Sequence, residues 1–255
     1  MLNMEAEKLA ENWSKLTDLI EQNFSGERKE NLKKLYEFLE DRMVYAPASG
    51  LEHYHNAFPG GYVDHILRVC ECAKRVKQNW EEMGATINFT DEELIFSALN
   101  HDLGKIGDLT EDYYVPNESE WHRKNQGKIY EGNKNIIHMP IPHRSLWMLQ
   151  EFGVKVSQNE YISIMTHDGV YDSGNETYLK TYLPERNLKT NLPIILHHAD
   201  HMASRIEYDM WKSEQPTQTK STFKKKSPSN KTTTSVNTSN KNINAAKLFD
   251  DLFKE

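Results

Sequence analysis

The chain has 255 residues and a formal net charge of −7, with 37% hydrophobic and 27% charged residues. This composition is ordinary for a globular protein with a polar appendage, and the length allows one large or two small domains. No apolar run approaches the ~20 residues that a membrane span needs. The first residues also lack the basic-then-apolar layout of a signal peptide. We therefore expect a cytoplasmic protein without a membrane partner.

The charge is unevenly distributed along the chain. Residues 216–255 contain eight lysines and three acidic residues, a net +5, which leaves −12 for residues 1–215. Broad, non-specific binding of nucleic acid needs a basic surface, so the acidic body argues against it. A local basic channel remains compatible with this charge.

Apolar residues at helical spacing predict two helices over 4–24 and 27–44. We expect them to form an N-terminal helical hairpin, residues 1–50. A turn rich in helix breakers follows, and it begins a second, all-α domain over 51–214. The helices of this domain are expected over 62–80, 92–103, 142–152, 157–167 and 193–212.

Two of these helices open with capping-box signals, Thr90 with Glu93 and Ser157 with Glu160. The pattern changes over residues 108–138, where aromatic residues are separated by Pro, Asn and Gly. We interpret this segment as an insertion that carries a short β-hairpin.

The C-terminal part of the chain has a different composition. Thr, Ser, Lys and Asn dominate residues 215–242, which predicts a disordered linker. Residues 243–255 regain hydrophobicity, with Leu and Phe spaced to lie on one side of a short helix. We expect a terminal interaction peptide, the alternative being a terminal helix that docks on its own body. The peptide resembles the hydrophobic-acidic tails that dock on replication sliding clamps, best known from phage replication and late-transcription proteins. That resemblance implies a sliding clamp, or another replication or transcription protein, as the partner.

The second domain places histidine and aspartate residues among otherwise apolar helical positions. A buried ionisable group is costly unless it is paired or binds a metal, so several that converge are easier to explain with metal than without. A mixed shell of imidazoles and carboxylates suits Mn, Fe, Co, Ni or Zn better than Ca. The residues concerned are His65, His101, Asp102, His143, His167 and Asp200.

Three segments carry these residues in a recognisable order. Gly60–His65 reads GGYVDH, His101–Lys105 reads HDLGK, and His197–Asp200 reads HHAD. Over roughly residues 53–205 the chain resembles the HD-domain metal-dependent phosphohydrolases. The Pro-Gly-Gly lead-in is especially similar to HD domains attached to bacterial 3′-to-5′ exoribonucleases. The family's fold is an all-helical bundle, which agrees with the predicted helices.

The resemblance also implies which residues hold metal. Four of them would ligate a first divalent ion: His65, His101, Asp102 and Asp200. The remaining two, His143 and His167, match the extra histidines of members that hold two ions.

Further polar residues flank this set. Lys105 could meet a phosphate, with a solvated lysine near a helix end as an equal alternative. Arg68, three residues after His65, could line the same cleft, although a surface arginine is the more frequent case. Asp168 could support a ligand or orient a water. We take Asp102, Lys105 and Asp168 as candidate catalytic residues, and Arg68 and Lys105 as candidates for substrate binding.

The resemblance implies hydrolysis of a phosphoester in a nucleotide or a nucleic acid. A divalent metal lowers the pKa of bound water from 15.7 towards ~7 and neutralises charge on a phosphoryl oxygen. A nucleotide fits the acidic body, whereas a nucleic-acid 3′ end fits the exoribonuclease-like lead-in. Two alternatives stay open. Some two-iron HD members are oxygenases that cleave carbon–carbon or carbon–phosphorus bonds with dioxygen. The HD body could also be a non-catalytic scaffold that binds replication or transcription proteins through the terminal peptide.

Overall fold

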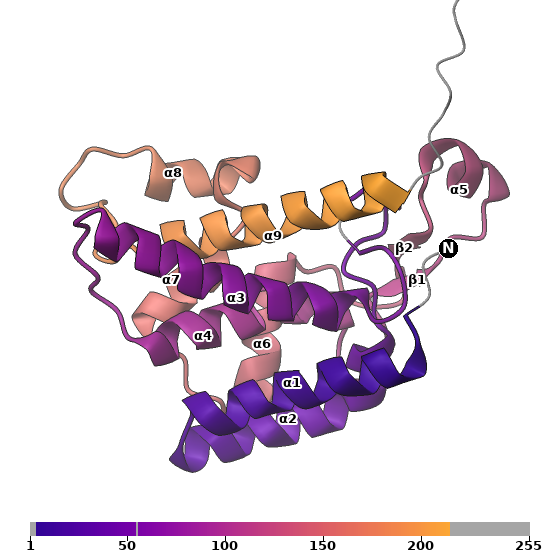
Figure 1. Cartoon of the computed structure of the whole chain (residues 1–255), viewed down its shortest axis with the longest axis horizontal. Helices are drawn as coiled ribbons and strands as arrows, with labels where there is room; N and C mark the ends of the chain where they lie inside the picture. Colours follow the sequence, from indigo (N-terminus) through magenta and orange to yellow (C-terminus); the bar gives the residue numbers. More distant parts are fainter. Residues whose placement is uncertain (1–3, 55, 215–255) are drawn as a thin grey trace, which may run out of the picture. The chain divides into compact units, whose positions relative to one another are not determined.

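The structure is a computed structural model that describes residues 4–54 and 56–214. The expected linker 215–242 and terminal peptide 243–255 lie outside the described residues. The predicted all-α class with a small antiparallel strand pair is confirmed (Figure 1). In the part of the chain that the structure describes, no helix is both long enough and apolar enough to cross a bilayer.

The first two helices lie where the apolar spacing predicts them, as α1 (Ala6–Asn23) and α2 (Gly26–Tyr45). They pack side by side (Figure 1) and bury Leu16 of α1 and Leu35 of α2 completely. Full burial of one such side chain contributes ~1.5–3 kcal/mol relative to leaving it in water. These residues belong to the same hydrophobic core as the helices that follow.

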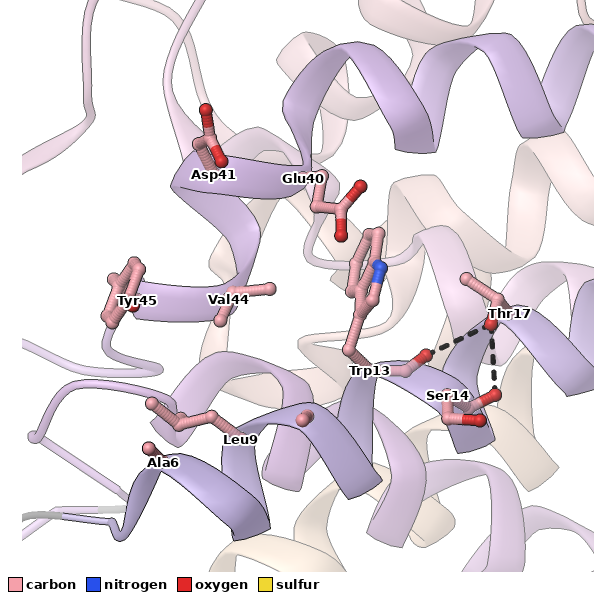
Figure 2. Close-up of a pocket in the computed structure, with 10 residues that line it drawn as sticks. Ala6, Leu9, Trp13, Ser14, Thr17, Glu40, Asp41, Val44 and Tyr45 are labelled. Atoms are coloured by element: carbon pink, nitrogen blue, oxygen red, sulfur yellow. Dashed lines mark hydrogen bonds between the residues drawn. The ribbon is translucent and has the colours of Figure 1, made fainter.

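A surface groove of about 520 Å³ runs between α1 and α2. Figure 2 shows Trp13 of α1 close to Glu40 and Val44 of α2 in this groove. The hydroxyl of Thr17 donates to the carbonyls of Trp13 and Ser14, at 3.2 and 3.0 Å, so it is satisfied within its own helix. None of the candidate metal ligands is among the residues that line the groove.

Two long helices, α3 (Gly61–Glu82) and α9 (Leu192–Glu214), lie along each other, with α3 between α9 and the pair α1 and α2 (Figure 1). The buried residues of α3 lie between Gly61 and Ala73, whereas Glu71, Lys74 and Arg75 are exposed, so the helix is amphipathic. Its N-terminal turn needs the glycines before it. Gly60 has a φ of +88°, and a Cβ on Gly61 would lie 2.1 Å from the carbonyl oxygen of Asn56.

The helix α4 (Asp91–Asn100) carries the segment that contains the HD dipeptide. Its predicted capping box is present, and so is that of α7 (Gln158–Thr166). The helix was expected to run to residue 103, but it ends earlier, with His101 as its C-cap. The 3₁₀ turn η1 (Leu103–Ile106) follows directly.

The helix α6 (Ile141–Glu151) packs against this turn and explains why the chain bends there. A Cβ on Gly104 would lie 2.3 Å from the carbonyl oxygen of Ile141, so only glycine allows this approach. The hydroxyl of Ser145 accepts from Gly104 N at 2.8 Å and lies 3.1 Å from the carbonyl oxygen of His101.

The insertion contains β1 (Tyr114–Pro116) and β2 (Tyr130–Gly132), which pair antiparallel with Val115 opposite Glu131. The short helix α5 (Glu120–Gln126) lies between the strands and was not predicted. Its signals are a Ser119 side-chain cap and a left-handed Gly127 at its C-terminus. The expected loop after His167 also contains short turns, η2 (Gly169–Tyr171), η3 (Ser173–Asn175) and α8 (Glu176–Leu179).

Arg28 of α2 connects this helix to α4 and α7 through two ion pairs. Its guanidinium lies 2.8 Å from Glu92 and 2.6 Å from Glu160, and it stacks 3.9 Å from the centre of the Phe96 ring. The side chain of Glu160 is 0% exposed. Burial raises the pKa of the Glu160 carboxyl, and the Arg28 ion pair opposes this rise. The pair therefore ties the helix that leads to His167 to the rest of the bundle.

Replacing Arg28 with alanine should lower the free energy of unfolding by about 3 kcal/mol, because it leaves the Glu160 carboxylate buried without its cation. Denaturant unfolding of the full chain measures this change. Lys124→Ala removes an exposed ion pair with Glu120 and should cost less than ~1 kcal/mol. Equal losses in the two variants would contradict the role given to Arg28.

Candidate metal centre

Five of the six predicted ligands come together inside the bundle. They form two overlapping groups whose ligand atoms lie within 4.8 Å of one another. His65 comes from α3, His101 and Asp102 follow α4, His167 caps α7, and Asp200 lies on α9. The groups are His65, His101 and Asp102, and His101, His167 and Asp200. The helices thus present imidazoles and carboxylates, side chains that together can bind a divalent metal.

The three histidines are all oriented through Nδ1. His101 Nδ1 donates to the carbonyl of Ala98 at 2.9 Å, and His167 Nδ1 donates to the carbonyl of Ile164 at 2.8 Å. His65 Nδ1 lies 3.1 Å from both carboxylate oxygens of Glu207. A carbonyl can only accept, so Nδ1 of His101 and His167 carries the proton. In the neutral imidazole, Nε2 is then the atom with a free lone pair.

The Nε2 atoms face carboxylate oxygens. His65 Nε2 lies 3.2 Å from Asp200, His101 Nε2 lies 3.4 Å from Asp102, and His167 Nε2 lies 3.5 Å from Asp102. Among the residues that the structure describes, His101 Nε2 is buried and makes no hydrogen bond. A neutral imidazole lone pair aimed at a carboxylate requires a proton or a metal cation between them. The residues present therefore fit a divalent ion.

The pKa shifts of the cluster residues also indicate that positive charge is favoured there. Burial alone would raise the pKa of Asp102, but Lys105 and His101 hold it well below its usual range. Burial likewise opposes ionisation of Asp200, and contact with His65 lowers its pKa. Glu207 and Asp200 outweigh the burial of His65 and raise its pKa to about 10, and carboxylates raise the pKa of His167 to about 9. A bound metal would replace the protons that these carboxylates attract, so its binding should release protons.

Glu207 supports the centre and was not predicted. Its side chain is 0% exposed, and it contacts His65 Nδ1 while Arg68 Nε donates to it at 3.2 Å. A carboxylate on the remote nitrogen of a ligating histidine fixes the ring and raises its basicity. The sequence contains one indication of this role: Glu207 lies seven residues after Asp200, which is two turns further along the same face of α9.

Arg68 is a candidate for substrate binding, with a surface arginine as the more frequent case. In the structure its guanidinium makes ion pairs with Asp64 at 3.1 Å and Glu207 at 3.2 Å. This placement favours a supporting role, in which Arg68 holds the Glu207 carboxylate against His65.

Lys105 lies against the centre, with its Nζ 2.6 Å from Asp102. Burial opposes its charge, but Asp102 raises the pKa of Lys105 above its ordinary value. The residue also lines a cavity of about 200 Å³ together with Tyr114 and Tyr130 of the insertion. None of the candidate ligands lines this cavity, so Lys105 is the residue that connects it to Asp102.

Asp168 marks the open side of the centre. Its carboxylate is 51% exposed and lies 3.8 Å from His167 Nε2. Of the two ligand carboxylates, Asp200 is 17% exposed and Asp102 only 3%. The exposure of Asp168 and of Asp200 is compatible with a role for Asp168 beside a bound substrate or water.

His143 is the predicted ligand that the structure does not bring to the cluster. It is exposed on α6 and lines a surface hollow of about 530 Å³ with Trp147 and Tyr161. The next residues, Arg144 and Ser145, are the ones that α6 buries against η1. His143 projects from another side of the same helix, so the structure does not support it as a metal ligand.

Comparisons with protein-family models, curated proteins and solved structures find no match for this chain. The assignment of a candidate metal centre therefore rests on the buried cluster itself.

Two histidine variants separate the residues in the cluster from the one outside it. His167→Ala removes an inward-facing nitrogen, so its metal affinity should fall by about tenfold or more. His143→Ala should keep the metal content of the unaltered chain. Elemental analysis after gel filtration measures both, with circular dichroism as the check on folding. Equal loss of metal in the two folded variants would restore His143 as a ligand.

Proposed function

We propose that this chain is a metal-dependent phosphohydrolase of the HD-domain type, acting on a phosphoester of a nucleotide or a nucleic acid. The single observation that supports it best is the buried set of inward-facing imidazoles and carboxylates. The sequence motifs that carry these residues supply the likeness to the family.

The residues that would hold a divalent ion are His65, His101, Asp102, His167 and Asp200. When bound, such an ion supplies a more acidic water and neutralises negative charge on a phosphoryl oxygen. The donor set of imidazoles and carboxylates suits Mn, Fe, Co, Ni or Zn. The two groups share His101, so they form one connected site for one or two ions.

The side chains around the ligands have separate tasks in this proposal. Lys105 keeps Asp102 ionised and brings positive charge to the wall where a phosphate would sit. Glu207 and Arg68 hold the His65 ring in place. Asp168 lies at the rim, where a carboxylate can accept a proton from water or orient it.

The charge of the chain bears on the class of substrate. Residues 1–215 carry −12 and offer no broad basic surface for a long polyanion. A small phosphorylated compound needs only local positive charge, which a bound divalent ion would supply beside the Lys105–Asp102 ion pair. We therefore favour a nucleotide, with the 3′ end of a nucleic acid as the second substrate to be compared in the same assay.

Asp102→Asn should abolish hydrolysis and most metal binding, because it removes a ligand carboxylate and leaves an amide of the same shape. Metal assistance is worth several kcal/mol, so the rate should fall on the order of a hundredfold or more. The assay loads the full chain with each candidate metal and measures phosphate release from nucleotides and oligonucleotides. Asp209→Asn, an exposed position on α9, is the matched control and should keep its rate.

Two results would contradict the proposal. One is metal-loaded protein that hydrolyses no phosphoester in the set. The other is an Asp102→Asn variant with an unchanged rate. Dioxygen consumption by the iron-loaded chain without phosphate release would instead indicate oxygenase chemistry.

A further inference from the structure

An aromatic stack lies beside the open side of the metal centre. The ring of Tyr171 in η2 is stacked on the ring of His201 in α9, with centroids 5.7 Å apart and an interplanar angle of 24°. Tyr171 is 73% exposed, and His201 is exposed as well. We call these two residues the aromatic platform.

The platform is attached to both segments that deliver ligands at this edge. His201 directly follows Asp200 on α9. Tyr171 lies three residues after Asp168, and its backbone N–H donates to the Asp168 carbonyl at 3.2 Å. Asp168 is the N-cap of η2, so Tyr171 lies one turn away from the exposed Asp168.

His197 fixes the platform from below. Its Nδ1 donates to the carbonyl of His167 at 2.8 Å, and its ring lies 5.9 Å from Tyr171 and 6.4 Å from His201. Gly169 allows this close fit, because a Cβ there would lie 2.3 Å from the His197 ring. The platform is therefore held in place before any ligand arrives, which lowers the cost of binding.

Tyr171 keeps its ring 73% exposed although its hydroxyl lies 3.4 Å from His201 Nδ1, so this contact holds the ring in place without burying it. One face of the pair therefore stays open to a ligand. Planar aromatic ligands bind such surfaces, and every nucleobase has a face that can stack. The platform adjoins Asp168 and Asp200, so a base stacked on it would extend from a phosphate held at the centre.

We propose that Tyr171 and His201 bind the base of the substrate, so that the centre prefers phosphoesters that carry a nucleobase. This inference rests on the proposed phosphohydrolase function and deepens it. The base is the shared chemistry of a free nucleotide and of the last nucleotide of a strand.

The kinetic test compares a nucleoside monophosphate with ribose 5-phosphate, which lacks the base, in the metal-loaded full chain. The preference for the nucleotide in kcat/KM should fall roughly tenfold to a hundredfold in Tyr171→Ala, equal to ~1.4–2.8 kcal/mol at 1.4 kcal/mol per tenfold. The change should appear in KM, because stacking holds ground state and transition state alike. Tyr171→Phe keeps the ring and should restore most of the preference.

Tyr182→Ala is the matched control, since Tyr182 is a tyrosine 96% exposed in the same connecting segment. It should leave the preference unchanged. A short oligonucleotide assayed beside the monophosphate decides which source of the base is used. An unchanged nucleotide preference in Tyr171→Ala would overturn the inference.

A binding measurement keeps the platform testable if no phosphoester is hydrolysed. Unphosphorylated nucleosides are titrated with the full chain, and their base protons are followed by NMR. Stacking should shift these protons upfield with the unaltered chain and with Tyr171→Phe, and not with Tyr171→Ala. Upfield shifts without hydrolysis would support base binding by the platform and contradict the proposed phosphohydrolase reaction. Hydrolysis without any shift would support the reaction and contradict base binding by the platform.

Discussion

The structure depends on how three buried imidazoles meet two carboxylates. Each Nδ1 is held by a partner outside the centre, so the Nε2 atoms of His65, His101 and His167 point inward at Asp102 and Asp200. Such a cluster is stable only when positive charge lies within it, as protons or as metal. The supporting residues follow from this constraint. Lys105 pairs with Asp102, and Glu207 with Arg68 fixes His65.

The surrounding bundle stabilises the fold enough to offset the cost of burying this polar centre. The helices that carry ligands also contribute fully buried apolar side chains, such as Ile66 of α3 and Leu196 of α9. Their burial offsets the desolvation of the charged groups. The close contact of Gly104 with Ile141 then places His101 and Asp102 at a fixed bend instead of along a continuous helix. Rigid packing of this kind keeps the ligand atoms within reach of one another.

Much of the fold could be predicted from the sequence, because apolar spacing and capping boxes are local signals. Thr90 and Ser157 mark helix starts that the structure confirms. Five ligands of the cluster could be predicted, because their motifs follow one another in the order typical of the HD family and their positions lie on otherwise apolar helices. The position of His143 outside the cluster could not, because a helix has several sides and the sequence does not say which side of α6 meets η1. Glu207 was missed because its role depends on the packing of α9 against α3, which no local pattern records.

The central claim is that the buried cluster binds a divalent metal, and anomalous X-ray diffraction tests it most directly. The full chain would be crystallised after loading with manganese or iron, and data would be collected at the absorption edge of that metal. The account predicts an anomalous peak in contact with His101 Nε2 and with the carboxylates of Asp102 and Asp200. Ordered side chains at these positions with no peak, and with His101 Nε2 bonded to water or protein, would contradict it.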